Sequence, residues 1–256
     1  MIILAGYQFL QETIMLSLPV RTVALRGVLY ILLLAGLMQA TLQIDVMHPG
    51  GPNLTETSLT EISQAAMLFL SAVLMLVIRQ RLQVMRTTSL LLWAFFAASF
   101  VRENDSWLDI YAFDGAWQCL VALIVVPTLA ISIIRHKAFA SEFRLFSNSL
   151  GFGLFAGGFL TTYLFSRLYG RSEMWQALMG DGYLRVVKDA AEEMTELAGY
   201  SLLLFASVEL CLLAVRLRRM GAARQPQATL HELVGSHEKA AVSTRNRRPA
   251  EKREHA

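Results

Sequence analysis

Residues Arg185 to Tyr200, with the sequence RVVKDAAEEMTELAGY, lead directly into the apolar run SLLLFASVELCLLAV. At 100° per residue, four carboxylates of the first stretch fall on one helical face: Asp189, Glu192, Glu193 and Glu196. Because like charges repel, this face must be hydrated, paired with cations or bound to a metal. It also lies at the mouth of a membrane-length segment, so the stretch predicts a polar site at a membrane surface.

The composition is that of a membrane protein. Hydrophobic residues make up 55% of the 256 and charged residues only 17%, whereas about a quarter of a typical soluble domain is charged. Both cysteines, Cys119 and Cys211, lie inside apolar runs, which indicates buried thiols rather than a disulfide or a metal cluster. The sequence contains no phosphate-binding loop, dinucleotide fingerprint or internal repeat.

The apolar runs predict an all-α fold, a bundle of about six transmembrane helices. The spans are expected at residues 27–44, 62–78, 87–101, 116–134, 147–166 and 198–215. Ser58 and Glu61 form a capping-box pattern before the second span. Gly153 and Gly157 form a G-x-x-x-G suited to close helix packing in the fifth.

The third run is short for a membrane span. From Thr87 to Val101 it rises about 22 Å, whereas the hydrocarbon core is roughly 30 Å thick. The helix is therefore expected to continue into the charged stretch that follows, Arg102, Glu103, Asn104 and Asp105. In a continuous helix Arg102 would pair with Asp105, one turn away.

The regions that flank the 27–216 transmembrane domain differ from it in composition. Residues 1–26 are interpreted as an interfacial segment, or as an over-extended start with Met15 the true initiator. Residues 217–256 are polar and basic and predict a disordered tail. A short amphipathic helix, EMWQALM at residues 173–179, is expected on the outer surface between the last two spans.

Basic residues are distributed unequally between the loops. Of the 23 lysines and arginines, 18 fall on the side that carries both termini and five on the other. The positive-inside rule places the first side in the cytoplasm. We therefore expect six spans with both termini cytoplasmic and both acidic stretches on the outer side.

The two acidic stretches together predict a ligand site on the outer face. Hard cations take oxygen ligands from several carboxylates, and the candidate ligand-binding residues are Arg102, Glu103, Asp105, Asp109, Glu192 and Glu196. The identity of any metal stays open. A divalent cation suits the ligands, whereas zinc is not favoured because His48 and His136 lie on opposite sides of the expected membrane. The alternative is a solvated rim whose carboxylates pair with nearby basic residues.

Glu209 lies near the middle of the sixth predicted span, away from the outer face. An ionisable residue at that depth is a candidate functional group. The structural alternative is a hydrogen-bonded glutamate facing the bundle, with Gln39, Thr161 or Thr162 as the expected partners.

The stretches FVRENDSWLD, FDGAW, FSRLYGR and VKDAAEEMTELAGYSLLLF resemble a group of uncharacterised proteobacterial multi-pass membrane proteins. The resemblance covers residues 20–216 and implies a six-span inner-membrane protein with no known activity. Glu192-Glu193 is also similar to the glutamate pair of CAAX-prenyl-type intramembrane proteases. The arginine expected four positions after that pair and the helical histidines are missing, so the protease chemistry is not implied.

These observations favour a non-enzymatic membrane protein that binds a cation or polar ligand, as a transporter or a sensor. One alternative is a membrane hydrolase of lipid or peptide with Glu192 or Glu196 as general base. Another is a scaffold subunit whose GLFAG face, residues 153–157, and tail bind a membrane-protein partner or a second copy. The lipid bilayer is the expected environment, and no specific nucleic-acid partner is expected.

Overall fold

The computed structural model describes residues 19–47 and 58–247, with side chains as far as Gly221, and every regular element in them is helical. In chain order these elements are α2 (Val20–Thr41), η1 (Leu42–Val46), α3 (Leu59–Val77), η2 (Ile78–Leu82), α4 (Arg86–Glu103), α5 (Asp105–Tyr111), α6 (Ala116–Ile134), α7 (His136–Ser147), α8 (Leu150–Leu160), η3 (Thr161–Phe165), α9 (Ser166–Tyr169), α10 (Ser172–Met179), η4 (Gly180–Gly182) and α11 (Arg185–Arg247). The π-helical segments η1, η2 and η3 directly continue the helices before them. The prediction of an all-α fold is confirmed.

Four helical segments are long and apolar enough to cross a membrane: Val20–Val46, Leu59–Leu82, Ala116–Ile134 and Arg185–Gly221. A fifth is added if His136–Ser147 and Leu150–Tyr169, which meet at a bend of 92°, count as one span. The helix α4 falls short because charged residues lie at both of its ends, Arg86 at one and Arg102 and Glu103 at the other. Several membrane-length helices are therefore present, while the count of six stays a prediction.

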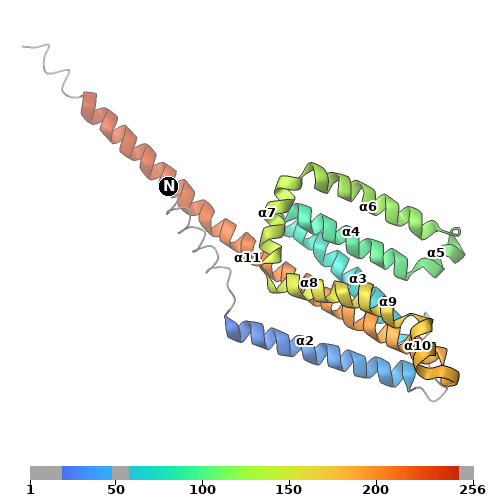
Figure 1. Cartoon of the computed structure of the whole chain (residues 1–256). Helices are drawn as coiled ribbons and strands as arrows, with labels where there is room; N and C mark the ends of the chain where they lie inside the picture. Colours follow the sequence, from blue (N-terminus) through green and yellow to red (C-terminus); the bar gives the residue numbers. More distant parts are fainter. Residues whose placement is uncertain (1–18, 48–57, 248–256) are drawn as a thin grey trace, which may run out of the picture.

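The helix α11 is the central element of the bundle (Figure 1). It packs against α8, η3, α9 and α3, and over a shorter length against α2. On the far side of α3, α4 packs between α3 and α6. Leu197, Leu203 and Leu210 of α11 are almost completely buried, as are Leu68 and Met75 of α3. Residues 185–200 thus begin the helix around which the other helices pack.

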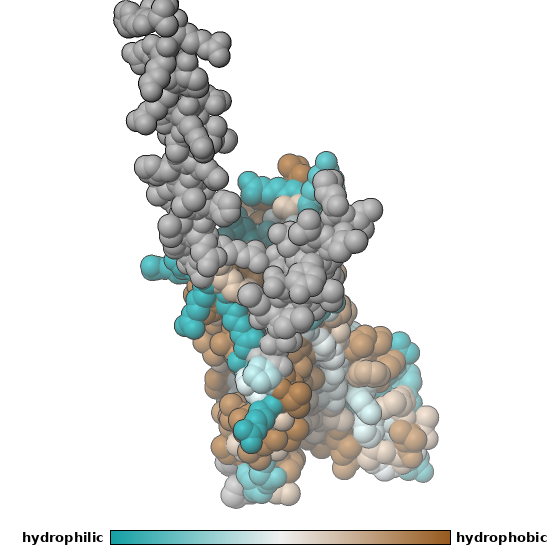
Figure 2. All heavy atoms as spheres, turned by 90° about the vertical axis from the view of Figure 1, so that its left-hand side faces the viewer, coloured by the Kyte–Doolittle hydropathy of each residue, from teal (hydrophilic) through white to brown (hydrophobic). Residues whose placement is uncertain are grey.

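Hydrophobic side chains form much of the outer surface of the bundle (Figure 2). The most apolar 18 residues of α2 include no buried residue, and Ile31 within them is 68% exposed. On α6, Leu123 is 72% exposed and Ile133 70%. Large exposed apolar surfaces mark contact with a partner or a membrane, so these two helices present the faces that suit lipid.

Close packing between the α8–η3 segment and α11 depends on glycines. A Cβ added to Gly158 would lie 2.8 Å from the Gly199 carbonyl oxygen, and one added to Gly199 would lie 2.0 Å from Thr162 Oγ1. The predicted pair does not make this contact: nothing lies within 4 Å of a Cβ on Gly153, and a Cβ on Gly157 meets one carbon at 4.0 Å. The prediction that glycines of this helix allow close packing is confirmed, but the contact is made by Gly158 and not by the predicted Gly153 and Gly157.

Side-chain caps fix the start of α3. The Ser58 hydroxyl accepts a hydrogen bond from the Glu61 N–H at 3.2 Å, which confirms this half of the predicted capping box. The carboxylate of Asp45, on η1, accepts from the N–H groups of Leu59 and Thr60 at 3.0 and 2.8 Å. Asp45 therefore joins the end of the first helical segment to the start of the next.

A second cap lies at the opposite end of the bundle, where α7 crosses the ends of its neighbours (Figure 1). Glu142 of α7 accepts from the N–H groups of Thr87 and Thr88 in the first turn of α4, at 2.8 and 2.7 Å. The residue before that turn, Met85, has a left-handed φ of 49°. Glu142 thus satisfies two amide groups that the helix itself leaves unpaired.

Several predicted boundaries differ from the structure. The first helix begins at Val20, so Arg26 is helical instead of lying in a preceding segment; residues 1–18, with Met15, and His48 lie outside the described residues. The backbone of 217–247 continues α11 as helix instead of being disordered, and its many Ala, Arg, Gln and Glu residues have high helix propensity. The predicted amphipathic helix is present as α10, and its placement on the outer side stays a prediction.

Candidate functional site

The candidate site lies where α4 and α9 end and α11 begins, at the end of the bundle that also carries α5 and α10 (Figure 1). Its acidic side chains come from α4 and from the first turns of α11, as the sequence predicted. They meet basic side chains from α4, α9 and α11, and we name this set the carboxylate cluster. Its members are Glu103, Asp189, Glu192, Glu193 and Glu196, with Arg102, Arg167, Arg185 and Lys188.

A hydrogen bond joins α4 directly to α11 within this cluster. The Tyr200 hydroxyl donates to Glu103 Oε1 at 2.5 Å, and Arg102 donates both to Glu103 and, at 3.5 Å, to the Tyr200 oxygen. Tyr163 and Ser99 extend the chain of polar groups through a hydroxyl–hydroxyl contact of 2.6 Å. The predicted meeting of the two acidic stretches is therefore confirmed for Glu103.

Arg167 at the end of α9 holds two carboxylates of α11. Its guanidinium lies 2.7 Å from Glu196 Oε1 and 3.2 Å from Glu192 Oε1. Ser166 also donates to Glu196 at 3.1 Å, and Lys188 lies 3.1 Å from the other oxygen of Glu192. Glu196 is only 4% exposed, so this part of the cluster is buried instead of solvated. The pairing of its carboxylates with nearby basic residues is what the alternative of a solvated rim predicted.

Glu193 has a different environment. Its carboxylate accepts a hydrogen bond from the Gln64 amide of α3 at 3.0 Å, and it forms no ion pair within the described part of the chain. The negative charges of Glu103, Glu192 and Asp189 all act on it unfavourably. Glu193 is therefore the carboxylate whose charge is least compensated in the cluster.

Three buried polar atoms in and beside the cluster have no hydrogen-bond partner within the described part of the chain. They are Gln64 Oε1, Arg102 Nε and Thr162 Oγ1. Gln64 is completely buried, and its amide nitrogen is already committed to Glu193. An unsatisfied buried acceptor costs about 1–3 kcal/mol, so the Gln64 oxygen favours the entry of a hydrogen-bond donor or a cation beside Glu193.

Two predicted site residues, Asp105 and Asp109, are not part of the carboxylate cluster. The helix breaks at Asn104, with φ −111° and ψ 26°, and α5 starts at Asp105. Arg102 consequently pairs with Glu103, and the predicted pairing with Asp105 is wrong. Asp109 accepts from the Gly115 N–H at 3.1 Å and thereby closes the loop between α5 and α6.

The geometry does not favour a metal centre. Across residues 19–47 and 58–221, no three carboxylate, histidine or cysteine side chains come together as a metal site would require. Glu103, Glu192 and Glu196 each accept from an arginine or a lysine. Both oxygens of Glu192 and one oxygen each of Glu103 and Glu196 are thus engaged by protein cations. A divalent ion such as Ca²⁺, which takes six or more oxygen ligands, would have to displace some of these bonds.

Glu209, the candidate inside the predicted span, lies apart from the cluster in an ion pair. Its carboxylate accepts from Arg26 at 2.8 Å and from the Tyr30 hydroxyl at 2.7 Å, both on α2. The Tyr30 ring also stacks on Phe205 with a centroid distance of 4.4 Å. The expected partners Gln39, Thr161 and Thr162 are wrong, and the residue serves to join α2 to α11.

Sequence reasoning missed the neutral groups that complete the cluster, Tyr200, Gln64 and Ser166. Gln64 and Ser166 are polar residues within or at the end of apolar runs, and this was the available signal. The hydrogen-bond partners of the charged residues could not be predicted from the sequence, because Gln64 and Glu193 are 129 positions apart and Glu103 and Tyr200 are 97 apart.

The fold and the site together define the class, an all-helical protein with several membrane-length helices and a buried ionic network at one end. Comparison with known protein families, with curated proteins and with solved structures gives no match. Function must therefore be argued from the site.

Proposed function

We propose that this chain is a non-enzymatic integral membrane protein whose carboxylate cluster takes up one positive charge, a proton or a monovalent cation, as part of transport or sensing. We further propose six spans in a bacterial inner membrane, with both termini cytoplasmic and the cluster on the outer side. The imbalance of charge in the cluster carries the proposal: five carboxylates face four basic groups.

A buried charge is costly unless it is compensated. If every group of the cluster is ionised, the cluster carries one uncompensated negative charge. We assign this charge to Glu193, because its carboxylate has only the Gln64 amide as a partner and lies near other carboxylates. The unpartnered Gln64 oxygen beside it offers a second acceptor. One added proton or monovalent cation would neutralise the cluster and use this acceptor.

The choice between a monovalent and a divalent ligand follows from the number of free oxygens. Glu196 and Glu192 share Arg167, and Glu103 is held by Arg102 and Tyr200. A divalent ion would have to displace these bonds. Both oxygens of Glu192 are engaged by Arg167 and Lys188, which argues against Glu192 as the general base of the hydrolase alternative.

Cation or proton uptake by the native state is tested through thermal unfolding of the full chain in nanodiscs. A ligand that binds only the folded protein stabilises it by about 2.7 kcal/mol at 100 times its Kd. We expect the unfolding temperature to rise either on acidification at fixed salt, which identifies a proton, or with one alkali cation at fixed pH.

The deciding variant is Glu193→Gln, and the matched control is Glu173→Gln on the exposed surface of α10 at the same end of the bundle. The Glu193→Gln variant removes the excess charge and should lose the dependence on pH or cation, while Glu173→Gln should keep it. An identical response of both variants and the original protein would refute the proposal.

A further inference from the structure

Basic side chains gather at the end of the bundle opposite the carboxylate cluster, where α7 crosses the ends of its neighbours (Figure 1). We name three of them the arginine cluster: Arg79 of η2, Arg86 at the start of α4, and Arg135 between α6 and α7. The charges of Arg86 and Arg135 both act unfavourably on Arg79, while the charge of Glu142 on α7 acts favourably. The carboxylate-cluster proposal makes no use of these residues.

The positive charge of the arginine cluster is not balanced by ion pairs. Within residues 19–47 and 58–221, no ion pair includes any of its members. Arg79 donates instead to the backbone carbonyl of Arg86. Glu142 uses one of its oxygens to accept from the N–H groups of Thr87 and Thr88. Three positive charges thus face one carboxylate, and this end of the bundle is complementary to an anion.

Two of the three guanidinium groups are available to a ligand from outside. The side chains of Arg86 and Arg135 are exposed, and neither donates a hydrogen bond to another group of the described residues. Guanidinium groups bind phosphate oxygens through paired N–H donors, with a geometry that an ammonium group does not offer. The chemistry of the arginine cluster therefore points to a phosphate group.

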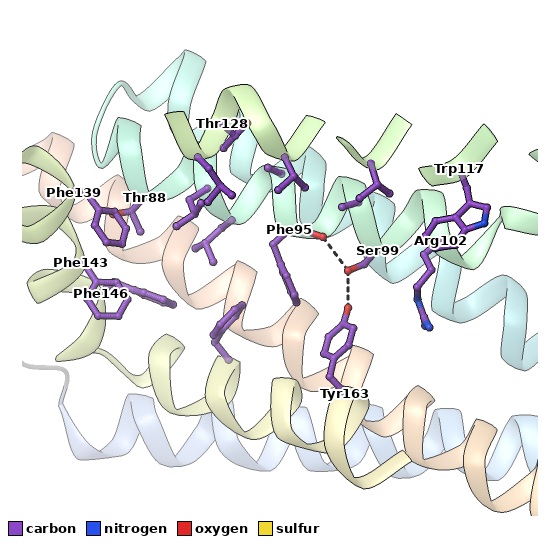
Figure 3. Close-up of a pocket in the computed structure, with 18 residues that line it drawn as sticks. Thr88, Phe95, Ser99, Arg102, Trp117, Thr128, Phe139, Phe143, Phe146 and Tyr163 are labelled. Carbon is purple, nitrogen blue, oxygen red and sulfur yellow. Dashed lines mark hydrogen bonds between the residues drawn. The ribbon is translucent and has the colours of Figure 1, made fainter. Parts of the chain in front are cut away.

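The helix α7 indicates that this end of the bundle lies at a membrane surface. Its phenylalanines Phe139, Phe143 and Phe146 line one end of a cavity of about 490 Å³ between α4, α6, α7 and α8 (Figure 3). On its opposite face Lys137 and Arg144 are exposed, and its axis is bent by 92° from that of the segment that follows. An amphipathic helix that lies across the ends of membrane-length helices is typical of the interface, at the level of the lipid head groups.

The exposed apolar surface of α6 extends to the arginine cluster. Ile133 is 70% exposed and Ile134 is 78% exposed, and the next residue is Arg135. A lipid whose chains lie along this face of α6 would have its phosphate at the level of Arg135. A soluble phosphate compound would make no use of the apolar surface, so the position of the cluster favours a lipid of the bilayer.

From these observations we infer that the arginine cluster binds the phosphate of an anionic phospholipid, whose chains lie along the exposed face of α6. An anionic lipid is favoured over a zwitterionic one, because the cationic head group of the latter would be repelled by the uncompensated arginines. The site goes beyond the proposed charge uptake and shares no side chain with it.

The inference is tested by native mass spectrometry of the full chain in detergent, with an equimolar mixture of phosphatidylglycerol and phosphatidylcholine that have identical chains. We expect the original protein to bind phosphatidylglycerol about tenfold more tightly. The double variant Arg86→Gln with Arg135→Gln should lose this preference. The matched control is Lys137→Gln with Arg144→Gln, which removes the same charge from the exposed face of α7 and should keep the preference.

Circular dichroism verifies that each variant is folded. Equal binding of the two lipids by the original protein, or the same loss of preference in both double variants, would overturn the inference. Inorganic phosphate in excess, at matched ionic strength, should not displace phosphatidylglycerol because it lacks the chains. Displacement would identify free phosphate as the ligand and would also overturn it. Since Glu193 and Gln64 are unchanged in every variant, these outcomes are independent of the charge-uptake proposal.

Discussion

Glu209 illustrates how a single buried charge is accommodated in an apolar helix. Its side chain is 4% exposed and that of Arg26 is 21% exposed, and the two form an ion pair at 2.8 Å to which Tyr30 adds a third group. Because α2 has few other contacts with the bundle, these side chains carry much of its attachment to α11. Removal of one partner would leave the other charge uncompensated, which is far more costly than removal of both.

We therefore predict that Arg26→Met destabilises the protein by about 3 kcal/mol, and that the double variant Arg26→Met with Glu209→Met recovers most of this loss. Equilibrium unfolding with SDS in mixed micelles measures both. The control is Tyr30→Phe, which keeps the ring stacked on Phe205 and should cost about 1 kcal/mol for the lost hydrogen bond. Additive losses in the double variant would show that the pair is not coupled.

Residue-level inference from sequence succeeded where the cause is local. The Ser58 cap depends on a spacing of three residues within one turn, and the sequence shows it directly. Glu103 and Glu196 could be selected because they follow or precede apolar runs. Their partners could not, since Arg167 and Tyr200 reach them only through the packing of distant helices.

At the scale of elements, glycines allow the α8–η3 segment and α11 to approach closely, because a larger side chain would collide with atoms of the opposite helix. A Cβ on Gly199 would lie 2.8 Å from the Thr162 nitrogen as well as 2.0 Å from its Oγ1. The helices would have to separate to admit it. The sequence shows that α8 is rich in glycine, but the face that contacts α11 depends on the relative rotation of two helices, which a single sequence does not encode locally.

We predict that Gly199→Ala destabilises the protein by about 2 kcal/mol or more, the cost of overpacking, whereas Gly153→Ala is neutral or stabilising by up to about 1 kcal/mol because alanine favours helix. Thermal unfolding in detergent compares them. The pair is matched, since both changes add one methyl group to a helical glycine. A loss from Gly153→Ala comparable to that from Gly199→Ala would place a second contact on the GLFAG face, as the scaffold alternative requires.

The cap on α4 provides a second test at this scale. Replacing Glu142 by Ala leaves the Thr87 and Thr88 N–H groups without their acceptor, and we expect a loss of about 1–2 kcal/mol, as for other helix caps. Lys137→Ala on the exposed surface of the same helix is the control. Amide hydrogen exchange should also quicken at the first turn of α4 in Glu142→Ala, and unchanged exchange there would contradict the assignment.

For the whole molecule, the open question is how many helices cross the membrane. Composition indicated six, and hydropathy of the observed helices supports four or five. The difference arises from α4, where charges at both ends shorten the apolar stretch, and from the 92° bend between α7 and α8. The helices α4 and α8 each run alongside the neighbours on which they pack (Figure 1). The network at the end of α4 explains how Arg102 and Glu103 could be accommodated at membrane depth.

The six-span arrangement is tested by labelling single cysteines with a membrane-impermeant maleimide, after Cys119 and Cys211 have been replaced by serine. We predict that a cysteine at Asp181, exposed between α10 and α11, reacts in intact bacterial cells. A cysteine at Arg135, exposed between α6 and α7, should react only after permeabilisation. Because six spans place these two loops on opposite sides, with the basic loop cytoplasmic, reaction of both from the same side would show that α8–α9 does not cross the membrane and would place the carboxylate cluster elsewhere.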